Sequence, residues 1–353
     1  MTYAPNTQIY KYHLVQKIGG GEFGEVWTAD DRAINNRLAV KLLDQERCSI
    51  DERLLEAQIG NRLIHPNVVN IKNADVVSFG EPPTPVVIIA MPFYTNGSVA
   101  SKVNAANFLD LDKALKCLID VLRGLEYLHE NGYYHCDIKP QNILIGNNNE
   151  CILTDYGITC HSPTHEAVSP RSLYLPHAAA ESISENRYDA RTDIYQLGLT
   201  AFRLINGIST VKEKFEKDRK AFGQLILDGK VITDSDFQPY VPHRLRRIIL
   251  KAASVNPDAR YQSALEMRRE LEKIDLRGGT VTANEHGKIT VMHNGNSYFY
   301  EISSGAKNST VFTALKENLS SRRVTKVSAY TCQVKNQNDI KKAAQKFFLS
   351  FIA

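Results

Sequence analysis

The chain has 353 residues, of which 43% are hydrophobic and 23% are charged, and its formal net charge is +4. These values are ordinary for a globular protein, and the length suffices for a two-lobed enzyme with one small additional domain. No apolar run reaches the roughly 20 residues that cross a bilayer, and residues 1–10 lack the apolar core of a signal peptide. The six cysteines form no CxxC pair, which argues against a zinc or disulfide framework and favours a reducing, cytoplasmic location.

Residues 11–93 are predicted to form strands with one intervening helix, after a polar N-terminal tail at residues 1–10. The helix is expected over residues 51–63, because its leucine and isoleucine residues recur on one side and Pro66 follows. The strands are expected at residues 12–18, 25–29, 37–43 and 86–91.

From residue 110 onward the hydrophobic period becomes helical. The first of these segments is long and amphipathic, and it ends near Asn131-Gly132, a typical helix stop. Helices are expected at residues 111–129, 191–206, 242–255 and 263–274.

A domain boundary is predicted at Arg277-Gly278-Gly279. From Leu276 to Ala353, eleven Lys and Arg residues stand against four Asp and Glu residues, so this segment carries a net charge of +7. The patterns predict a small basic α+β domain over residues 280–353, with Asn294-Gly295 as a tight hairpin. Its expected elements are strands at 280–284, 288–293 and 297–302, a helix at 310–319, a strand at 324–334 and a helix at 339–352.

A glycine cluster lies between the first two strands, where backbone amides could approach phosphate oxygens closely. Taken alone this cluster is weak evidence for phosphate binding, because a glycine-rich hairpin without a ligand would have the same sequence pattern. A lysine that ends the third apolar strand, Lys41, would need an anionic partner, and Glu56 on the following helix could supply it. A surface salt bridge is the simpler explanation of that pair. The cluster reads Gly19, Gly20, Gly21, Glu22, Phe23, Gly24, Glu25 and Val26.

The decisive stretch packs a carboxylate, a cation and an amide into one loop, His135-Cys136-Asp137-Ile138-Lys139-Pro140-Gln141-Asn142. Phosphoryl transfer needs a carboxylate that orients the attacking hydroxyl, a cation near the γ-phosphate, and metal ligands. Asp137, Lys139 and Asn142 could fill these roles, and Asp155-Tyr156-Gly157 supplies a second metal-binding carboxylate. Carboxylate and amide oxygens suit Mg²⁺. Each piece alone could be a solvated loop, but the joint order and spacing favour catalysis.

With these motifs in order, residues 11–275 resemble a complete protein kinase domain of the eukaryotic-like Ser/Thr type. The resemblance implies an α+β, bilobal fold with a β-rich N-lobe over about 11–93, a helical C-lobe over about 95–275, and ATP with Mg²⁺, or Mn²⁺, between them. It implies catalytic roles for Asp137, Lys139, Lys41 and Glu56, and metal binding by Asn142 and Asp155. It assigns the nucleotide pocket to the glycine cluster together with Val26, Ala39, Lys41, Met91, Pro92, Tyr94 and Leu144.

The resemblance also gives structural roles to residues later in the chain. Ala179-Ala180-Glu181 stands where Ala-Pro-Glu is usual, Asp193 matches a buried aspartate of the central helix, and Arg260 matches the arginine that pairs with Glu181. The lysine at 139 is typical of Ser/Thr rather than tyrosine kinases.

Three positions depart from the family pattern. Cys136 replaces the arginine that usually grips a phosphorylated activation segment, so phosphorylation is not expected to order the catalytic loop through this position. Tyr156 replaces phenylalanine, and Gly60 stands one turn after Glu56 where a bulky apolar residue usually packs. The larger Tyr156 could fill that space, or the packing there could simply be looser.

Two other functions compete with a protein kinase. A pseudokinase scaffold, acting through the C-terminal domain, conflicts with the intact catalytic positions, and a small-molecule kinase of the aminoglycoside type usually lacks the segment between Asp155 and Glu181. We expect a protein substrate, no membrane partner and no nucleic acid, since no recognised binding signature is present. The C-terminal domain resembles no known family; it could bind a regulatory partner or an acidic surface, or inhibit the kinase region in cis. Its charge of +7 would also permit nucleic acid, although a solvated basic face explains that charge more simply.

Overall fold

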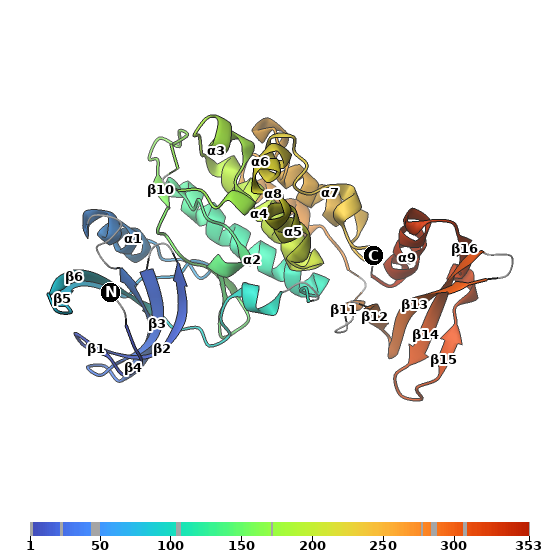
Figure 1. Ribbon diagram of the computed structural model, residues 1–353, viewed down its shortest axis with the longest axis horizontal. Coiled ribbons are helices and arrows are strands. Elements are labelled where there is room, and N and C mark those ends of the chain that lie inside the picture. The colour runs from blue at the N-terminus through green and yellow to red at the C-terminus, as the bar shows by residue number, and fades with distance from the viewer. Residues whose placement is uncertain are drawn as a thin grey trace.

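The N-terminal part of the chain is a six-stranded sheet with one helix against it (Figure 1). Its strand order is β1-β2-β3-β4-β6-β5, all neighbours being antiparallel. Residues 86–90 lie on β6, between β4 and β5, and are completely buried, which explains why they are continuously apolar. The elements are β1 (Gln8–Ile9), β2 (Tyr12–Gly21), β3 (Gly24–Asp31), β4 (Asn36–Leu43), α1 (Ile50–Arg62), β5 (Asn73–Phe79) and β6 (Thr84–Pro92).

The computed structural model describes residues 3–21, 24–43, 50–103, 107–170, 172–276, 278–283, 288–305 and 309–352, and gives only the backbone for 51–53. Two residues of the predicted glycine loop, Glu22 and Phe23, therefore lie outside the described residues. Within the first ten residues, Gln8–Ile9 pairs with β2, and both Tyr3 and Ile9 are buried. This part of the expected N-terminal tail packs on the sheet instead.

The middle of the chain is helical and is built around α4, whose residues are almost all buried. The helix starts at a capping box. The Asp189 carboxylate accepts a hydrogen bond from the Arg191 amide, and the Thr192 hydroxyl oxygen accepts one from the Asp189 amide. Four of these helices were predicted within a few residues of their ends. Helices α3, α5 and α6 were missed because they are short and, in α5, mostly charged. The helices are α2 (Leu111–Glu130), α3 (Ala180–Ser184), α4 (Ala190–Asn206), α5 (Ser209–Lys217), α6 (Arg219–Leu227), α7 (His243–Ala252) and α8 (Ala264–Glu272).

Two small two-stranded sheets carry the loops between α2 and α3. One pairs β8 (Ile143–Ile145) with β9 (Cys151–Leu153), and the other pairs β7 (Tyr133–Tyr134) with β10 (Cys160–His161). The predicted catalytic loop, residues 135–142, runs between β7 and β8, so a strand holds each of its ends.

The C-terminal part is an antiparallel sheet with one helix packed on it. The order is β11-β12-β13-β14-β15, and β16 also pairs with β14. Asn294 and Gly295 both have positive φ, as the predicted tight hairpin between β12 and β13 requires. The elements are β11 (Thr280–Ala283), β12 (Ile289–His293), β13 (Asn296–Ser304), β14 (Thr310–Asn318), β15 (Val324–Lys326), β16 (Cys332–Val334) and α9 (Gln337–Ile352).

The predicted helix at residues 310–319 was wrong, because this segment is strand β14. It pairs with β13 over nine residues, and only Phe312 and Ala314 are buried, two positions apart. Its β-branched residues Thr310, Val311 and Thr313 favour a strand. The predicted strand at 324–334 is two short strands separated by a helical turn.

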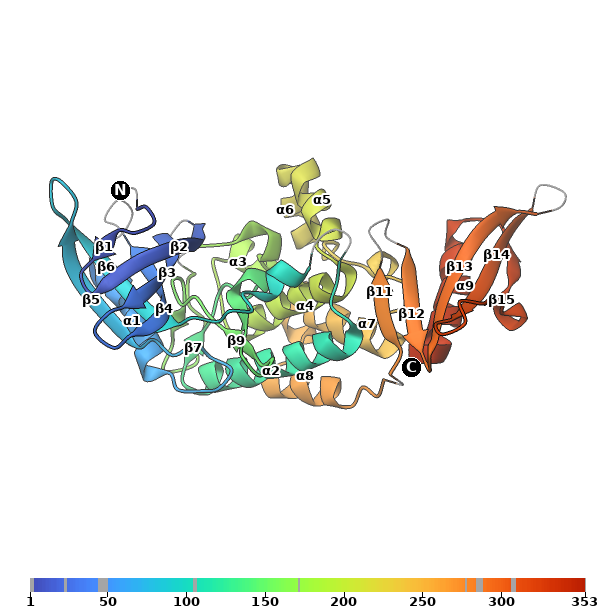
Figure 2. The same ribbon diagram turned by 90° about the horizontal axis from the view of Figure 1, so that it is seen from below.

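The C-terminal sheet lies at the end of the helical part that is farthest from the N-terminal sheet (Figures 1 and 2). The backbone amide of Val281 donates a hydrogen bond of 2.9 Å to the Asp110 carboxylate, at the start of α2. Lys341 on α9 donates to the carbonyl of Ser235. The attachment is therefore to the helical part, and no described residue of the C-terminal sheet lies beside the N-terminal sheet. None of the helices in the described part of the chain is long and apolar enough to span a membrane.

Phe347 is the centre of the aromatic cluster that joins α9 to its sheet, since its ring contacts Tyr298, Phe312, Tyr330 and Phe351. We predict that Phe347→Ala destabilises this part by about 3–5 kcal/mol, the usual loss for a buried phenylalanine. Hydrogen exchange should accelerate in β13 and α9 but not in α4. The exposed Lys342→Ala on the same helix is the matched control, and unchanged protection in Phe347→Ala would contradict the prediction.

Candidate catalytic site

Three predicted site residues from distant parts of the sequence meet in one buried ion cluster. Lys41 Nζ at the end of β4 lies 2.8 and 2.9 Å from the two Glu56 oxygens on α1, and 2.8 Å from Asp155 Oδ1. Both Lys41 and Glu56 are buried, so this is not the surface salt bridge that the sequence left open. The side chain of Asp155 remains one-third exposed, at 33%.

Mutual charge fixes the protonation states of this cluster. Burial opposes the ionisation of Asp155, but the charge and hydrogen bond of Lys41 outweigh it and lower the pKa of the carboxyl to about 2. Burial likewise opposes the charge on Lys41, yet the Asp155 and Glu56 carboxylates hold its pKa above the ordinary value. Burial raises the pKa of Glu56, and Lys41 counters that effect. Two described groups donate hydrogen bonds to Asp155, and both use Oδ1: Lys41 Nζ at 2.8 Å and the Gly157 amide at 3.4 Å.

The loop residues Asp137, Lys139 and Asn142 lie in mutual contact. Lys139 Nζ is 2.6 Å and Asn142 Nδ2 is 2.8 Å from the same oxygen, Oδ2 of Asp137. Asn142 Nδ2 also donates to the Asp137 carbonyl, at 2.9 Å. The other carboxylate oxygen, Oδ1, is buried and has no hydrogen-bond partner among the described residues. A buried acceptor left open in this way is costly in an inert core and is common where a reacting group must bind.

The backbone of the catalytic loop is bonded to Asp193, which is completely buried on α4. Its carboxylate accepts hydrogen bonds from the backbone amides of His135 and Cys136, both at 2.9 Å. His129 at 2.9 Å and the Tyr188 hydroxyl at 2.6 Å complete the set. Burial opposes the negative charge, but these hydrogen bonds prevail and lower the pKa of Asp193.

Two residues of the site adopt the left-handed backbone conformation that L-residues rarely take. Cys136 has φ +68° and Asp155 has φ +72°. Each such residue costs of order 1–3 kcal/mol, and these outliers gather at functional sites. At Cys136 the two bonds to Asp193 and Gln196, which donates to its carbonyl at 2.9 Å, hold the strained backbone.

Gly60 and Tyr156 form part of a packed column between α1 and the loop. A Cβ at Gly60 would lie 2.4 Å from Ile71 Cδ1 and 3.1 Å from the Tyr156 ring. The space left by the glycine is therefore filled, more closely by Ile71 than by the expected Tyr156. The Tyr156 hydroxyl donates to the Val69 carbonyl at 2.7 Å, a bond that phenylalanine could not make.

The predicted nucleotide residues lie along the strands of the N-terminal sheet and at β8. Gly19, Gly20 and Gly21 on β2 pair with Val26, Glu25 and Gly24 on β3. Gly24 has φ +128°, and a Cβ there would lie 2.2 Å from the Leu42 carbonyl oxygen, so only glycine fits. Ala39 pairs with Met91, which is buried, and Leu38 pairs with Pro92. Tyr94 follows β6, and Leu144 lies on β8 and bridges to Ser98.

The later predicted pair is also in contact. Arg260 donates to both oxygens of Glu181, at 2.7 and 2.9 Å, and both side chains are buried. The sequence analysis missed Tyr188, Gln196 and His177, which bond to Asp193, the Cys136 carbonyl and the Ile138 carbonyl. No local signal marks these residues, because their partners lie far away in sequence.

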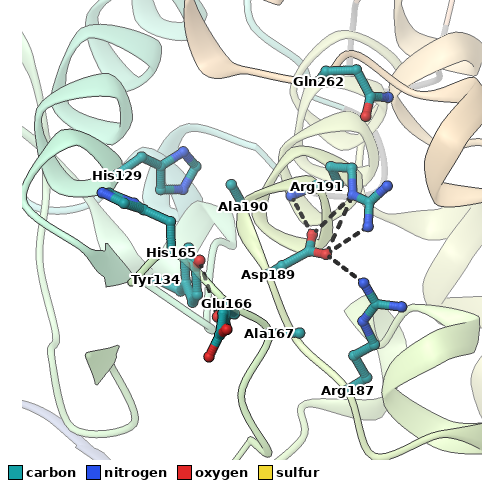
Figure 3. Close-up of a pocket in the computed structure, with 10 residues that line it drawn as sticks. All are labelled: His129, Tyr134, His165, Glu166, Ala167, Arg187, Asp189, Ala190, Arg191 and Gln262. Atoms are coloured by element: carbon teal, nitrogen blue, oxygen red, sulfur yellow. Dashed lines mark hydrogen bonds and ion pairs between the residues drawn. The ribbon is translucent and has the colours of Figure 1, made fainter. Parts of the chain in front are cut away.

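A hollow away from these residues is lined in part by residues 165–167 and the start of α4 (Figure 3). It has a volume of about 520 Å³ and is lined by none of the predicted catalytic residues. Arg187 and Arg191 turn toward Asp189 in it, at 3.6 and 2.8 Å, and Arg191 also pairs with Asp258, so two carboxylates balance the two arginines. We therefore place the candidate site at Asp137 and Lys41. The described residues also contain no group of three His, Cys, Asp or Glu side chains that could hold a metal by themselves.

Comparison with known proteins agrees with this assignment. Residues 12–270 match the protein kinase domain family. Similar curated proteins include a probable serine/threonine-protein kinase of Clostridium perfringens, 28% identical over 275 residues, and the serine/threonine-protein kinase PknD of Chlamydia trachomatis, 28% identical over 303 residues. The serine/threonine-protein kinase PrkC of Bacillus subtilis is 26% identical over 273 residues.

These alignments cover about three-quarters of this chain, 75%, 74% and 74% respectively. They cover much less of the relatives, namely 38%, 31% and 40% of their lengths. The chain thus spans less than half the length of the relatives that it matches.

The lowered pKa of Asp155 predicts a pH effect on stability. A carboxyl whose pKa is depressed by folding stabilises the fold above its unfolded value, 3.8, and loses that contribution as the pH falls toward about 2. Asp155→Asn has no such titration and keeps the Lys41–Glu56 pair. Urea unfolding should therefore show a larger loss of stability between pH 5 and pH 3 for the wild type than for Asp155→Asn. Equal losses would show that folding does not perturb this carboxyl.

Proposed function

Because the chain belongs to the protein kinase domain family, we propose that it transfers the γ-phosphate of ATP to serine or threonine side chains of a protein substrate. The observation that carries this proposal is the open, buried Oδ1 of Asp137, set beside Lys139 and Asn142. In the proposed reaction this oxygen accepts the hydrogen bond of the substrate hydroxyl and then its proton. Lys139 stands close enough to stabilise charge that develops on the transferred group.

The residues that face the nucleotide are proposed from the family pattern and their positions. Lys41, fixed by Glu56, would contact the α- and β-phosphates, and the backbone of residues 19–24, including Glu22 and Phe23, would cover the phosphates. The adenine would lie among the side chains and backbone groups of Val26, Ala39, Met91, Pro92, Tyr94 and Leu144. Their place on β3, β4, β6 and β8 supports this assignment.

Asn142 and Asp155 fit the role of Mg²⁺ ligands. The Asn142 nitrogen is used by Asp137, which leaves its carbonyl oxygen as the acceptor, and the Asp155 carboxylate stays ionised because of Lys41. Hard oxygen donors suit Mg²⁺ and Mn²⁺. When bound, such an ion would neutralise charge on the phosphate oxygens.

We further propose a division into an N-lobe at about 11–93, a C-lobe at about 95–275, and a C-terminal domain at 280–353. The pair Gly278-Gly279 and the change to a sheet with its own helix support the last boundary. The C-terminal domain would bind a regulatory partner, and its attachment to Asp110 and Ser235 leaves its outer sheet strands away from the N-lobe.

The catalytic set can be tested by substitutions that remove function but not packing. Asp137→Asn should lower kcat for phosphate transfer to a protein substrate by roughly 10²–10⁴-fold, the range for loss of a general base. Lys41→Met should also abolish transfer, because it leaves the Glu56 and Asp155 charges unbalanced. Asp112→Asn and Lys113→Met are matched controls, since both side chains are exposed on α2.

The readout is transfer of labelled phosphate, followed by phosphoamino-acid analysis, with circular dichroism to confirm folding. If Asp137→Asn retained near-wild-type transfer, the role of that carboxylate would be wrong. A wild type that binds ATP but transfers nothing would instead favour the pseudokinase alternative.

We also propose that activity does not require phosphate on the activation segment, residues 155–181. Cys136 is a buried, neutral thiol whose pKa burial raises, so it cannot pair with a phosphate. Of the five serine and threonine residues in the segment, Thr159 and Ser162 are buried, which leaves Thr164, Ser169 and Ser172 within reach of another kinase. Arg171, the cation that the sequence suggested nearby, lies outside the described residues.

Replacing Thr164, Ser169 and Ser172 by alanine together should leave activity on an outside substrate within about threefold of wild type, because nothing in the described site uses a phosphate there. The same assay on Thr159→Ala separates an internal effect, since its hydroxyl bonds to the His135 carbonyl at 3.3 Å. A fall of the triple variant to the level of Asp137→Asn, with folding intact, would mean that a different cation switches the segment.

A further inference from the structure

Arg203 on α4 is a buried cation without an anionic partner. It is 5% exposed, and no carboxylate of the described residues lies within ion-pair distance of it. Its Nη1 donates to His177 Nε2 at 2.6 Å, and it interacts with the hydroxyl of Tyr174. Its Nε is buried and has no hydrogen-bond partner in the part of the chain that the structure describes.

His177 cannot balance this charge. Its Nδ1 bonds to the Ile138 carbonyl at 2.8 Å, so Nδ1 carries the proton and Nε2 accepts from Arg203. Burial and the Arg203 charge both keep the pKa of His177 well below its ordinary value, and the ring is neutral. Arg203 is thus held by two neutral groups, although a guanidinium stays charged in proteins.

An unpaired buried charge is costly, since the effective penalty for burying an ion is several kcal/mol unless a counter-ion accompanies it. The other buried Lys and Arg side chains of the described residues each have a carboxylate within 4.0 Å: Lys41 faces two, Arg260 faces Glu181, and Arg246 has Asp234 at 3.9 Å. Arg203 is the exception among these four buried cations, which indicates that its counter-ion comes from outside the folded chain.

The position of Arg203 points to the source of that counter-ion. His177, its partner, contacts the backbone of Ile138, the residue after Asp137. Tyr174, its other neighbour, is half-buried and holds Lys139 Nζ 4.6 Å from its ring centroid, while the same ammonium bonds to Asp137. Tyr174 and Lys139 are therefore partly exposed side chains that lie between Arg203 and the carboxylate of Asp137.

We propose that Arg203, reached by movement of the Tyr174 side chain, is a specificity-determining residue that selects protein substrates with an anionic side chain near the accepted serine or threonine. The anion, a carboxylate or a phosphate, would take the free Nε–H and replace the weaker contact with Tyr174. This inference rests on the proposed kinase function, and it adds the chemical class of the substrate to it.

The test uses the full chain with Mg²⁺ and ATP and a set of degenerate peptides with one central serine or threonine. Each flanking position carries in turn Asp or Glu, phosphoserine, Lys or Arg, or Ala. The wild type should favour an anionic residue at one position or more by roughly tenfold, the effect of one charge-assisted hydrogen bond. Comparing the Asp and Glu arm with the phosphoserine arm identifies which source of the anion is used.

Arg203→Gln should reduce the ratio of kcat/KM for the anionic and alanine peptides to about one, and Arg203→Glu should reverse it toward Lys or Arg, following the sign of the charge. A purely structural arginine would lower rates on all peptides alike and leave the ratio unchanged. Arg247→Gln, an exposed arginine on α7, is the matched control and should keep the wild-type ratio.

The peptide preference of the wild type tests the inference even if a variant does not fold. A flat profile from an active wild type, or an unchanged ratio in folded Arg203→Gln, overturns the inference and leaves the kinase function standing. Absence of transfer to every peptide would instead contradict the kinase function, and the inference with it.

Discussion

The carboxylate of Asp193 is the contact on which the catalytic loop depends. A fully buried charge is tolerated only when hydrogen bonds replace the water that it lost, and here two backbone amides, one imidazole and one hydroxyl do so. The two amides belong to His135 and Cys136, so satisfying the charge also fixes the backbone that precedes Asp137. The left-handed conformation of Cys136 persists because releasing it would leave a buried anion short of a donor.

Some buried polar groups of this protein have partners within the chain, and others lack them among the described residues and are therefore available to a ligand. Lys41 and Arg260 are each matched by carboxylates of the same chain, so their order is complete without any bound molecule. The open Oδ1 of Asp137 and the unpaired Nε of Arg203 are the reverse case. Asp137 Oδ1 is a buried acceptor and Arg203 Nε is a buried donor. Asp137 is bonded to Lys139, and Arg203 interacts with Tyr174, whose ring contacts the same lysine. A peptide that offers a hydroxyl and an acid would satisfy the two together.

The sequence predicted the parts of this site whose spacing is local. The loop from His135 to Asn142 and the pair Lys41 and Glu56 were identified because each residue type has a chemical role at a fixed distance along the chain. Arg203 could not be recognised, because an arginine in a helical pattern is normally exposed, and only the fold shows its burial. The segment at 310–319 failed for another reason: its apolar residues fit a helical and an alternating period, and pairing with β13 decided between them.

The column through Gly60, Ile71 and Tyr156 links α1 to the loop that carries Asp155. Ile71 occupies the place where a side chain at position 60 would stand, so α1 can approach the strand and bring Glu56 to Lys41. The hydroxyl of Tyr156 then anchors the start of the activation segment to the Val69 carbonyl, and Asp155, its neighbour, reaches Lys41 from the other side. Each of these contacts uses neutral packing or charges within the chain. They support the proposal that the site is ordered without a phosphate on the activation segment.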